Sequence, residues 1–148
     1  MIKKNSIQPD YETKNETKAG NYFVSNYPPF SFWNESDISC VSSLLKSPSP
    51  GKAPLGIYYH VPFCRKRCHF CYFKVYTDKN SKDLRKYINS TLQELETYSN
   101  SNYIKGRKPK FVYFGGGTPS YLSAQQLTEL TDKMKDILSW DEAEEVTF

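Results

Sequence analysis

The chain of 148 residues lacks a long hydrophobic run, and it has only 2 histidines and 4 cysteines. No stretch approaches the roughly 20 apolar residues that a transmembrane helix needs, so no membrane span is predicted. The basic start, Met1–Ser6, is not followed by an apolar segment, which argues against a secretory signal. The cysteines are not spread out as a disulfide framework would require. We therefore expect a protein of the reducing cytoplasm.

The chain also lacks a dominant charge of one sign. It has 20 Lys and Arg against 16 Asp and Glu, which gives a formal net charge of +4. The basic residues are spread along the chain, and the densest runs are Arg65–Arg67 and Arg107–Lys110. Nucleic-acid-binding domains usually concentrate positive charge on one face or helix. We therefore expect no nucleic-acid partner.

Three of the 4 cysteines gather within eight residues, at Cys64, Cys68 and Cys71, in the pattern C-x3-C-x2-C. Free cysteine packs as a small hydrophobe and gains nothing from close neighbours in the sequence, so this density indicates a metal centre. Thiolate-rich sites select zinc, copper(I) or iron–sulfur clusters. Cys40 stands apart, and we expect it to be structural or incidental.

Three kinds of site are compatible with this spacing. A structural zinc site needs a fourth ligand, which His60 or His69 could supply. A redox disulfide would leave one cysteine over. An iron–sulfur cubane held by three thiolates would leave one iron without a protein ligand, open to a small chelating molecule. The spacing favours the cluster and leaves the other two as alternatives.

Strands and helices are predicted to alternate after residue 50. Hydrophobic periodicity and capping residues predict a strand at 55–61, a helix over roughly 81–98, a strand at 110–114, a helix that begins near 123 and a strand from 145. This order predicts βαβ units and a parallel sheet. Residues 1–50 are predicted to be an irregular N-terminal extension. Two units and a strand cannot close a barrel, so we expect 51–148 to be a piece of a larger α/β domain.

Three consecutive glycines, Gly115, Gly116 and Gly117, end the strand at 110–114. Without Cβ atoms, their backbone can approach a ligand closely. Ligands of parallel α/β folds bind at the carboxyl ends of strands, where the cysteine loop also emerges. The glycines are not a phosphate-binding P-loop, since no Gly-Lys-Ser/Thr follows. We therefore expect the two loops to share one site.

Taken together, these motifs resemble those of the radical S-adenosylmethionine (SAM) superfamily. Its hallmark, C-x3-C-x-aromatic-C, matches Cys64–Cys71. The lead-in Tyr58–Cys64 and the block Phe114–Ser120 are similar to those of the subgroup of oxygen-independent coproporphyrinogen III oxidase, the HemN-like proteins. On this resemblance, residues 51–148 form the N-terminal part of a partial TIM-type barrel, with two βα units and the start of a third strand.

The resemblance also implies a site and a chemistry. The implied ligands of a 4Fe–4S cluster are Cys64, Cys68 and Cys71, and the implied contacts of SAM are Tyr58, Phe70, Gly115, Gly116, Gly117 and Thr118. A reducing electron donor would supply one electron, and SAM would be cleaved to methionine and a 5′-deoxyadenosyl radical. That radical would abstract hydrogen from a small-molecule substrate. No catalytic residue of the chain itself is assigned.

The resemblance leaves the substrate open. Porphyrinogen decarboxylases carry a further cysteine two residues beyond the third, where this chain has Phe73. We expect a HemN-like oxidoreductase that acts on a porphyrinogen-like or other small molecule. The alternatives are a radical SAM methyltransferase, a cyclopropane-forming enzyme and a binding protein that resembles the haem chaperones. We expect the 148 residues to be inactive by themselves.

Overall fold

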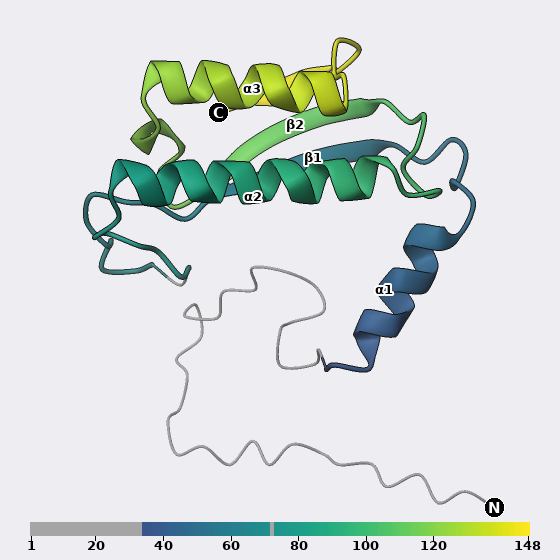
Figure 1. Cartoon of the computed structure of the whole chain (residues 1–148), viewed down its shortest axis with the longest axis horizontal. Coiled ribbons are helices and arrows are strands. Elements are labelled where there is room, and N and C mark those ends of the chain that lie inside the picture. Colours follow the sequence, from purple (N-terminus) through teal and green to yellow (C-terminus); the bar gives the residue numbers. More distant parts are fainter. Residues whose placement is uncertain (1–33, 72) are drawn as a thin grey trace, which may run out of the picture. The chain divides into compact units, whose positions relative to one another are not determined.

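The computed structural model describes residues 34–71 and 73–148, and a three-stranded parallel sheet lies at its centre. The strands, in spatial order, are β1 (Leu55–Val61), β2 (Pro109–Gly116) and β3 (Glu145–Thr147). The helices are α1 (Asp37–Lys46), α2 (Ser81–Ser99) and α3 (Ala124–Ile137), with a short 3₁₀ helix, η2 (Pro119–Tyr121). α2 connects β1 to β2 and α3 connects β2 to β3 (Figure 1). The predicted parallel α/β arrangement is confirmed.

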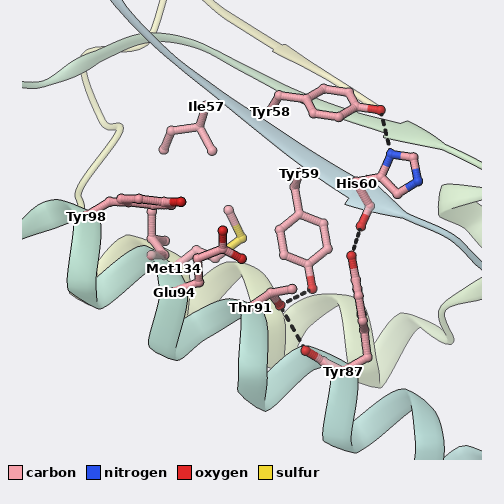
Figure 2. A pocket seen from close by; sticks show the side chains of 10 residues that line it. Ile57, Tyr58, Tyr59, His60, Tyr87, Thr91, Glu94, Tyr98 and Met134 are labelled. Carbon is pink, nitrogen blue, oxygen red and sulfur yellow. Dashed lines mark hydrogen bonds between the residues drawn. The ribbon is translucent and has the colours of Figure 1, made fainter. Parts of the chain in front are cut away.

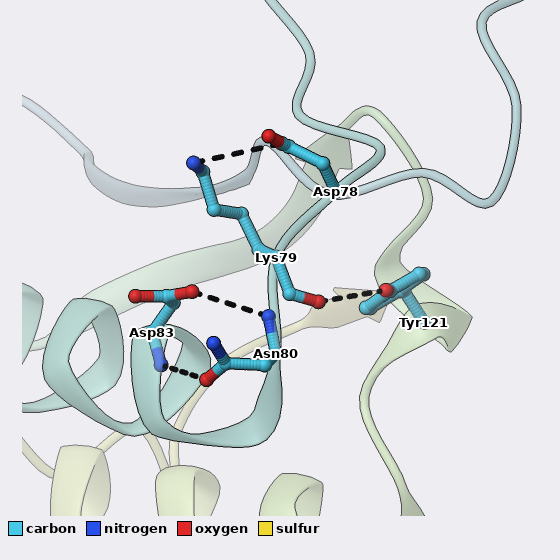
Figure 3. A network of polar contacts seen from close by, with 5 residues as sticks. All are labelled: Asp78, Lys79, Asn80, Asp83 and Tyr121. Atoms are coloured by element: carbon cyan, nitrogen blue, oxygen red, sulfur yellow. Dashed lines mark hydrogen bonds and ion pairs between the residues drawn. The ribbon is translucent and has the colours of Figure 1, made fainter.

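α2 begins at a reciprocal cap that the sequence had indicated. The side chain of Asn80 accepts hydrogen bonds from two backbone N–H groups of the first turn, and the Asp83 carboxylate accepts one from the Asn80 backbone. The residue before the cap is also held, because the Tyr121 hydroxyl donates to the Lys79 carbonyl (Figure 3). α2 is therefore tied at its start to η2, which follows the glycine loop.

The core lies between the sheet and the two long helices, which run side by side over one face of the sheet (Figure 1). The strands contribute the buried side chains of Ile57, Tyr59, Val61, Val112 and Phe114, and the helices contribute those of Leu84, Ile88, Leu92, Leu130 and Met134. On the opposite face Tyr58, Phe111 and Tyr113 are 53%, 47% and 46% exposed. Within the described residues, the sheet is thus covered on one face.

α1 corrects the expectation that all of residues 1–50 are irregular. Asp37 lies in its first turn and Lys46 in its last, which suits the helix dipole. Its apolar residues Ile38, Val41 and Leu44 are at least half exposed, so no buried stripe marks the helix. Residues 1–33, which carry most of the predicted extension, lie outside the described residues. No helix in the described part of the chain is long and apolar enough to cross a membrane.

Leu130 offers a test of the core. Its side chain is 0% exposed against the sheet, so Leu130→Ala should lower the free energy of unfolding by about 2–5 kcal/mol. The matched control is Leu44→Ala, at a side chain that is 50% exposed, where we expect a change within about 0.5 kcal/mol. Urea unfolding of the full-length protein measures both. Equal losses in the two variants would contradict this assignment of the core.

Candidate functional site

The cysteine loop and the glycine loop leave the same edge of the sheet. Val61, the last residue of β1, is paired with Gly116 at the end of β2. The pairing continues past the strands, because the Gly117 N–H donates to the Val61 carbonyl at 2.7 Å and the Thr118 N–H donates to the Phe63 carbonyl at 3.0 Å. The two motif loops are therefore joined by backbone hydrogen bonds.

Cys64 lies at this junction. It is 6% exposed, and the Thr118 hydroxyl donates a hydrogen bond to its Sγ at 3.3 Å. A Cβ on Gly117 would lie 2.7 Å from the same sulfur and 3.0 Å from the carbonyls of Phe63 and Val61. These distances are too short for a side chain, so glycine is required at position 117.

The loop that carries the other two thiols is closed at its base. The Cys64 N–H donates to the Tyr76 carbonyl at 3.0 Å. Within the loop, the Cys71 N–H donates to the Cys68 carbonyl at 3.1 Å, and the Arg67 guanidinium donates to the Cys71 carbonyl at 2.9 Å. The loop is thus shaped by hydrogen bonds to its own backbone carbonyls. Its three cysteines form no disulfide.

The three predicted ligands differ in exposure. Cys64 is buried, Cys71 is partly buried and Cys68 is exposed. Across residues 34–71 and 73–148, no three His, Cys, Asp or Glu side chains converge at metal-binding distance. The structure therefore places Cys64 against the glycine loop, and the complete ligand set stays a prediction. The donor chemistry fits an iron–sulfur cluster, because the loop supplies three sulfurs and no carboxylate, beside the cradle at Gly117.

The backbone of Gly115 and Gly116 lies directly against aromatic rings from β1 and β2. A Cβ on Gly115 would lie 2.8 Å from the Tyr58 ring and 2.7 Å from the Tyr113 ring, which stack on each other with centroids 5.8 Å apart. Gly116 has a φ of +100°, and a Cβ there would lie 2.8 Å from the His60 ring. The structure thus brings Tyr58 to the glycine loop, and its contact with a cofactor stays a prediction. Phe70, the other predicted aromatic contact, is 79% exposed.

Tyr58 and His60 form a hydrogen-bonded pair next to these glycines. The Tyr58 oxygen lies 2.9 Å from His60 Nδ1 (Figure 2). Burial lowers the pKa of His60, and burial, with a smaller contribution from Tyr113, raises the pKa of Tyr58. The imidazole is therefore neutral and the phenol protonated at neutral pH, so the hydrogen bond joins two uncharged groups.

A second set of tyrosines holds β1 from the helix side, and the sequence did not reveal it. The Tyr87 hydroxyl on α2 donates to the His60 carbonyl at 2.6 Å, and the Tyr59 hydroxyl lies 2.7 Å from Thr91 Oγ1. These groups line a cavity of about 240 Å³ between β1 and α2 (Figure 2). Burial raises the pKa of Tyr59 to about 12, so its hydroxyl stays protonated. Tyr87 lies within the helix predicted over roughly 81–98, but only the fold shows that it anchors the backbone of the site.

Residues 58–146 match the radical SAM superfamily, which is more than half of the chain. The chain belongs to this superfamily. Radical SAM proteins bind a 4Fe–4S cluster and SAM. The family predicted from the three motifs is thereby confirmed.

Individual relatives include proteins named as heme chaperones and as coproporphyrinogen III oxidases. Over 100 residues, the chain is 31% identical to the heme chaperone HemW of Haemophilus influenzae, which covers 66% of this chain and 26% of the relative. Over 94 residues, it is 38% identical to the oxygen-independent coproporphyrinogen III oxidase of Helicobacter pylori strain J99, covering 63% of this chain and 19% of the relative.

The fold is also similar to a solved structure, the coproporphyrinogen III oxidase HemN of Escherichia coli, with a TM-score of 0.65 and 24% identity. That likeness covers 84% of this chain and 28% of the solved one. The matched part of the chain thus spans between 19% and 28% of the length of these proteins.

The contact between Gly117 and Cys64 can be tested by Gly117→Ala. The methyl group would push the Cys64 sulfur and two carbonyls away, so we expect iron bound per chain after anaerobic reconstitution to fall by more than half. Gly51→Ala is the control, because nothing lies within 4 Å of its Cβ position, although its φ of +71° gives the variant a backbone cost of its own. Unchanged iron content in Gly117→Ala would contradict the cradle.

The protonation of His60 gives a test by pH. Since its folded pKa is lowered from 6.5, the unfolded chain takes up a proton first as the pH falls. The contribution of His60 to stability is therefore full above about pH 6.5 and is lost as the pH falls towards its folded pKa. An NMR titration of the full-length protein measures that pKa, with His60→Gln to assign the signal. A pKa above 6.5 would show that the neutral pair with Tyr58 is wrong.

Proposed function

We propose that residues 51–148 form the cofactor-binding N-terminal part of a radical SAM core, in which Cys64, Cys68 and Cys71 hold a 4Fe–4S cluster. The observation that carries this proposal is the junction of the two loops. Cys64 is buried against Gly117 and Thr118, and the hydrogen bond between Thr118 and Cys64 spans 54 positions of the sequence. This junction lies at the carboxyl edge of a parallel sheet, where such folds bind ligands.

The residues around the junction have separate roles in this proposal. Three thiolates leave one iron free for the amino and carboxylate groups of SAM. When bound, the cluster supplies the electron for reductive cleavage of SAM. In this proposal the backbone of Gly115–Thr118 would contact the methionine moiety of SAM, Tyr58 would lie near the cluster and Phe70 would contact the adenine. His60 orients Tyr58 through the hydrogen bond between its Nδ1 and the Tyr58 hydroxyl, and Tyr87 holds the backbone of His60 in place.

For the complete protein, we infer a HemN-like oxidoreductase that abstracts hydrogen from a porphyrinogen-like or other small molecule. The relatives named as coproporphyrinogen III oxidases support this inference. The second candidate is a haem chaperone, as several relatives are named. It is favoured by Phe73, which stands where the decarboxylases carry a further cysteine and packs edge-on against the His60 ring at 5.9 Å. Radical methyl transfer and cyclopropane formation are further alternatives.

Anaerobic reconstitution of the full-length protein with iron and sulfide tests the cluster. We expect about four irons per chain and an electron paramagnetic resonance signal of the reduced protein that changes when SAM is added. Cys64→Ser, Cys68→Ser and Cys71→Ser should each lose most of the iron. Cys40→Ser is the matched control, because Cys40 lies on α1, away from the loop in sequence, and should keep it. One zinc per chain with no signal from a reduced cluster would refute the proposal.

The two candidate functions separate in a second measurement on the same material. Deoxyadenosine formed from SAM under reducing conditions supports the radical enzyme. A bound-haem absorption spectrum with no transformation of an added porphyrinogen supports the chaperone.

A further inference from the structure

The loop between Cys64 and Tyr76 carries an unbalanced positive charge. Its cations are Arg65, Lys66, Arg67 and Lys74. It contains no carboxylate, and none occurs between Ile38 and Thr77. In a chain with 16 acidic residues, so long a gap makes this loop a local positive surface.

The charges of Arg65 and Lys66 are not neutralised within the described part of the chain. Both residues are exposed, and neither takes part in the ion pairs found there. By contrast, Lys110 and Lys133 each pair with a carboxylate. Arg67 is also engaged, since it donates to the Cys71 carbonyl. Lys74 lies over the Tyr76 ring, with its Nζ 5.7 Å from the ring centroid. Arg65 and Lys66 are therefore the two cations of the loop that are exposed and have neither an ion pair nor an aromatic contact in the described part of the chain.

These two cations lie beside the predicted cluster ligands. Lys66 is two residues from both Cys64 and Cys68, so its Cα lies within about 8 Å of each cysteine Cα. Cys68 is exposed, which means that solvent reaches the loop on the side where its sulfur lies. A molecule drawn to the positive charge would arrive next to the thiols.

We propose that this basic loop is the docking surface for an acidic protein that carries one electron at a time. The inference rests on the proposed function, because the cluster must be reduced from outside. The carrier loses one electron and is oxidised by one unit, the cluster gains that electron, and no proton or group is transferred. Complementary charge speeds such an encounter and orients the partners, and the attraction weakens as salt screens it.

The test measures binding rather than turnover. Full-length protein loaded with its cluster is titrated anaerobically with oxidised flavodoxin, an acidic FMN protein, in a calorimeter at low and high salt. Arg65→Glu/Lys66→Glu should weaken binding about tenfold or more, because it reverses the two free charges. Arg67 is left intact, since its hydrogen bond shapes the loop.

The control is Lys52→Glu/Lys105→Glu, which changes the net charge by the same amount. Both lysines are exposed and precede β1 and β2, so they lie towards the opposite end of the strands from the cysteine loop. We expect binding to change less than about twofold in this variant. If the Glu variant of the loop fails to take up iron, Arg65→Gln/Lys66→Gln replaces it, with a smaller loss expected in the same direction.

Several results would overturn the docking surface. Flavodoxin binding could weaken equally in both double variants, or in neither. Its affinity could be independent of salt, or the protein could bind a short DNA duplex more tightly than flavodoxin.

The proposed function fails in a different way, which dithionite reveals because this reductant needs no docked carrier. Wild-type protein that forms no deoxyadenosine with dithionite contradicts the proposed function. Deoxyadenosine with dithionite, together with binding that ignores the loop charges, contradicts the docking surface alone.

Discussion

The parallel pairing of β1 with β2 is the contact on which the site depends. Because both strands run in the same direction, their carboxyl ends reach one edge, and the hydrogen bonds from Gly117 and Thr118 extend the pairing past the strands. The register is decisive. A slip of one residue that put Thr118 in place of Gly117 would bring a side chain to the Cys64 sulfur, where even a Cβ would lie 2.7 Å away. It would also turn the buried face of the strand towards solvent.

Burial on the helix face fixes that register. Val61 and Val112 are 0% and 1% exposed, and each such side chain contributes roughly 1.5–3 kcal/mol when it is removed from water. α2 adds a directional contact, because the Tyr87 hydroxyl donates to the His60 carbonyl on β1, which is an edge strand of the described sheet. On the other face, the side chain of His60 is hydrogen-bonded to the Tyr58 hydroxyl. Packing behind the sheet thus positions the groups in front of it.

Local signals in the sequence predicted the elements well, because capping boxes and hydrophobic periodicity are written in neighbouring residues. Asn80 and Ser123 cap their helices as expected. α1 was missed because its apolar side chains are exposed and mark no buried stripe. The glycines were predicted to let a ligand approach closely. In the structure, the rings of Tyr58 and His60 on β1 already border the space at Gly115 and Gly116. Motif spacing cannot reveal this contact, because the residues are far apart in the sequence. The convergence of the three thiols also depends on more than the local sequence, because metal binding itself supplies free energy that organises such loops.

The uncovered face of the sheet bears on the choice between the two candidate functions. Parallel sheets are normally covered on both faces, and here Tyr58, Phe111 and Tyr113 present a half-exposed aromatic surface beside the cofactor edge. The Phe111 ring lies so close over Gly56 that a Cβ there would come within 2.0 Å of it, so part of this face is already closed by its own side chains. Relatives named as oxidases and as haem chaperones match comparable lengths of this chain, with 94 and 100 aligned residues. Relatives named for two different activities thus match this chain over similar lengths, so the likeness of this part does not by itself separate the two candidate functions.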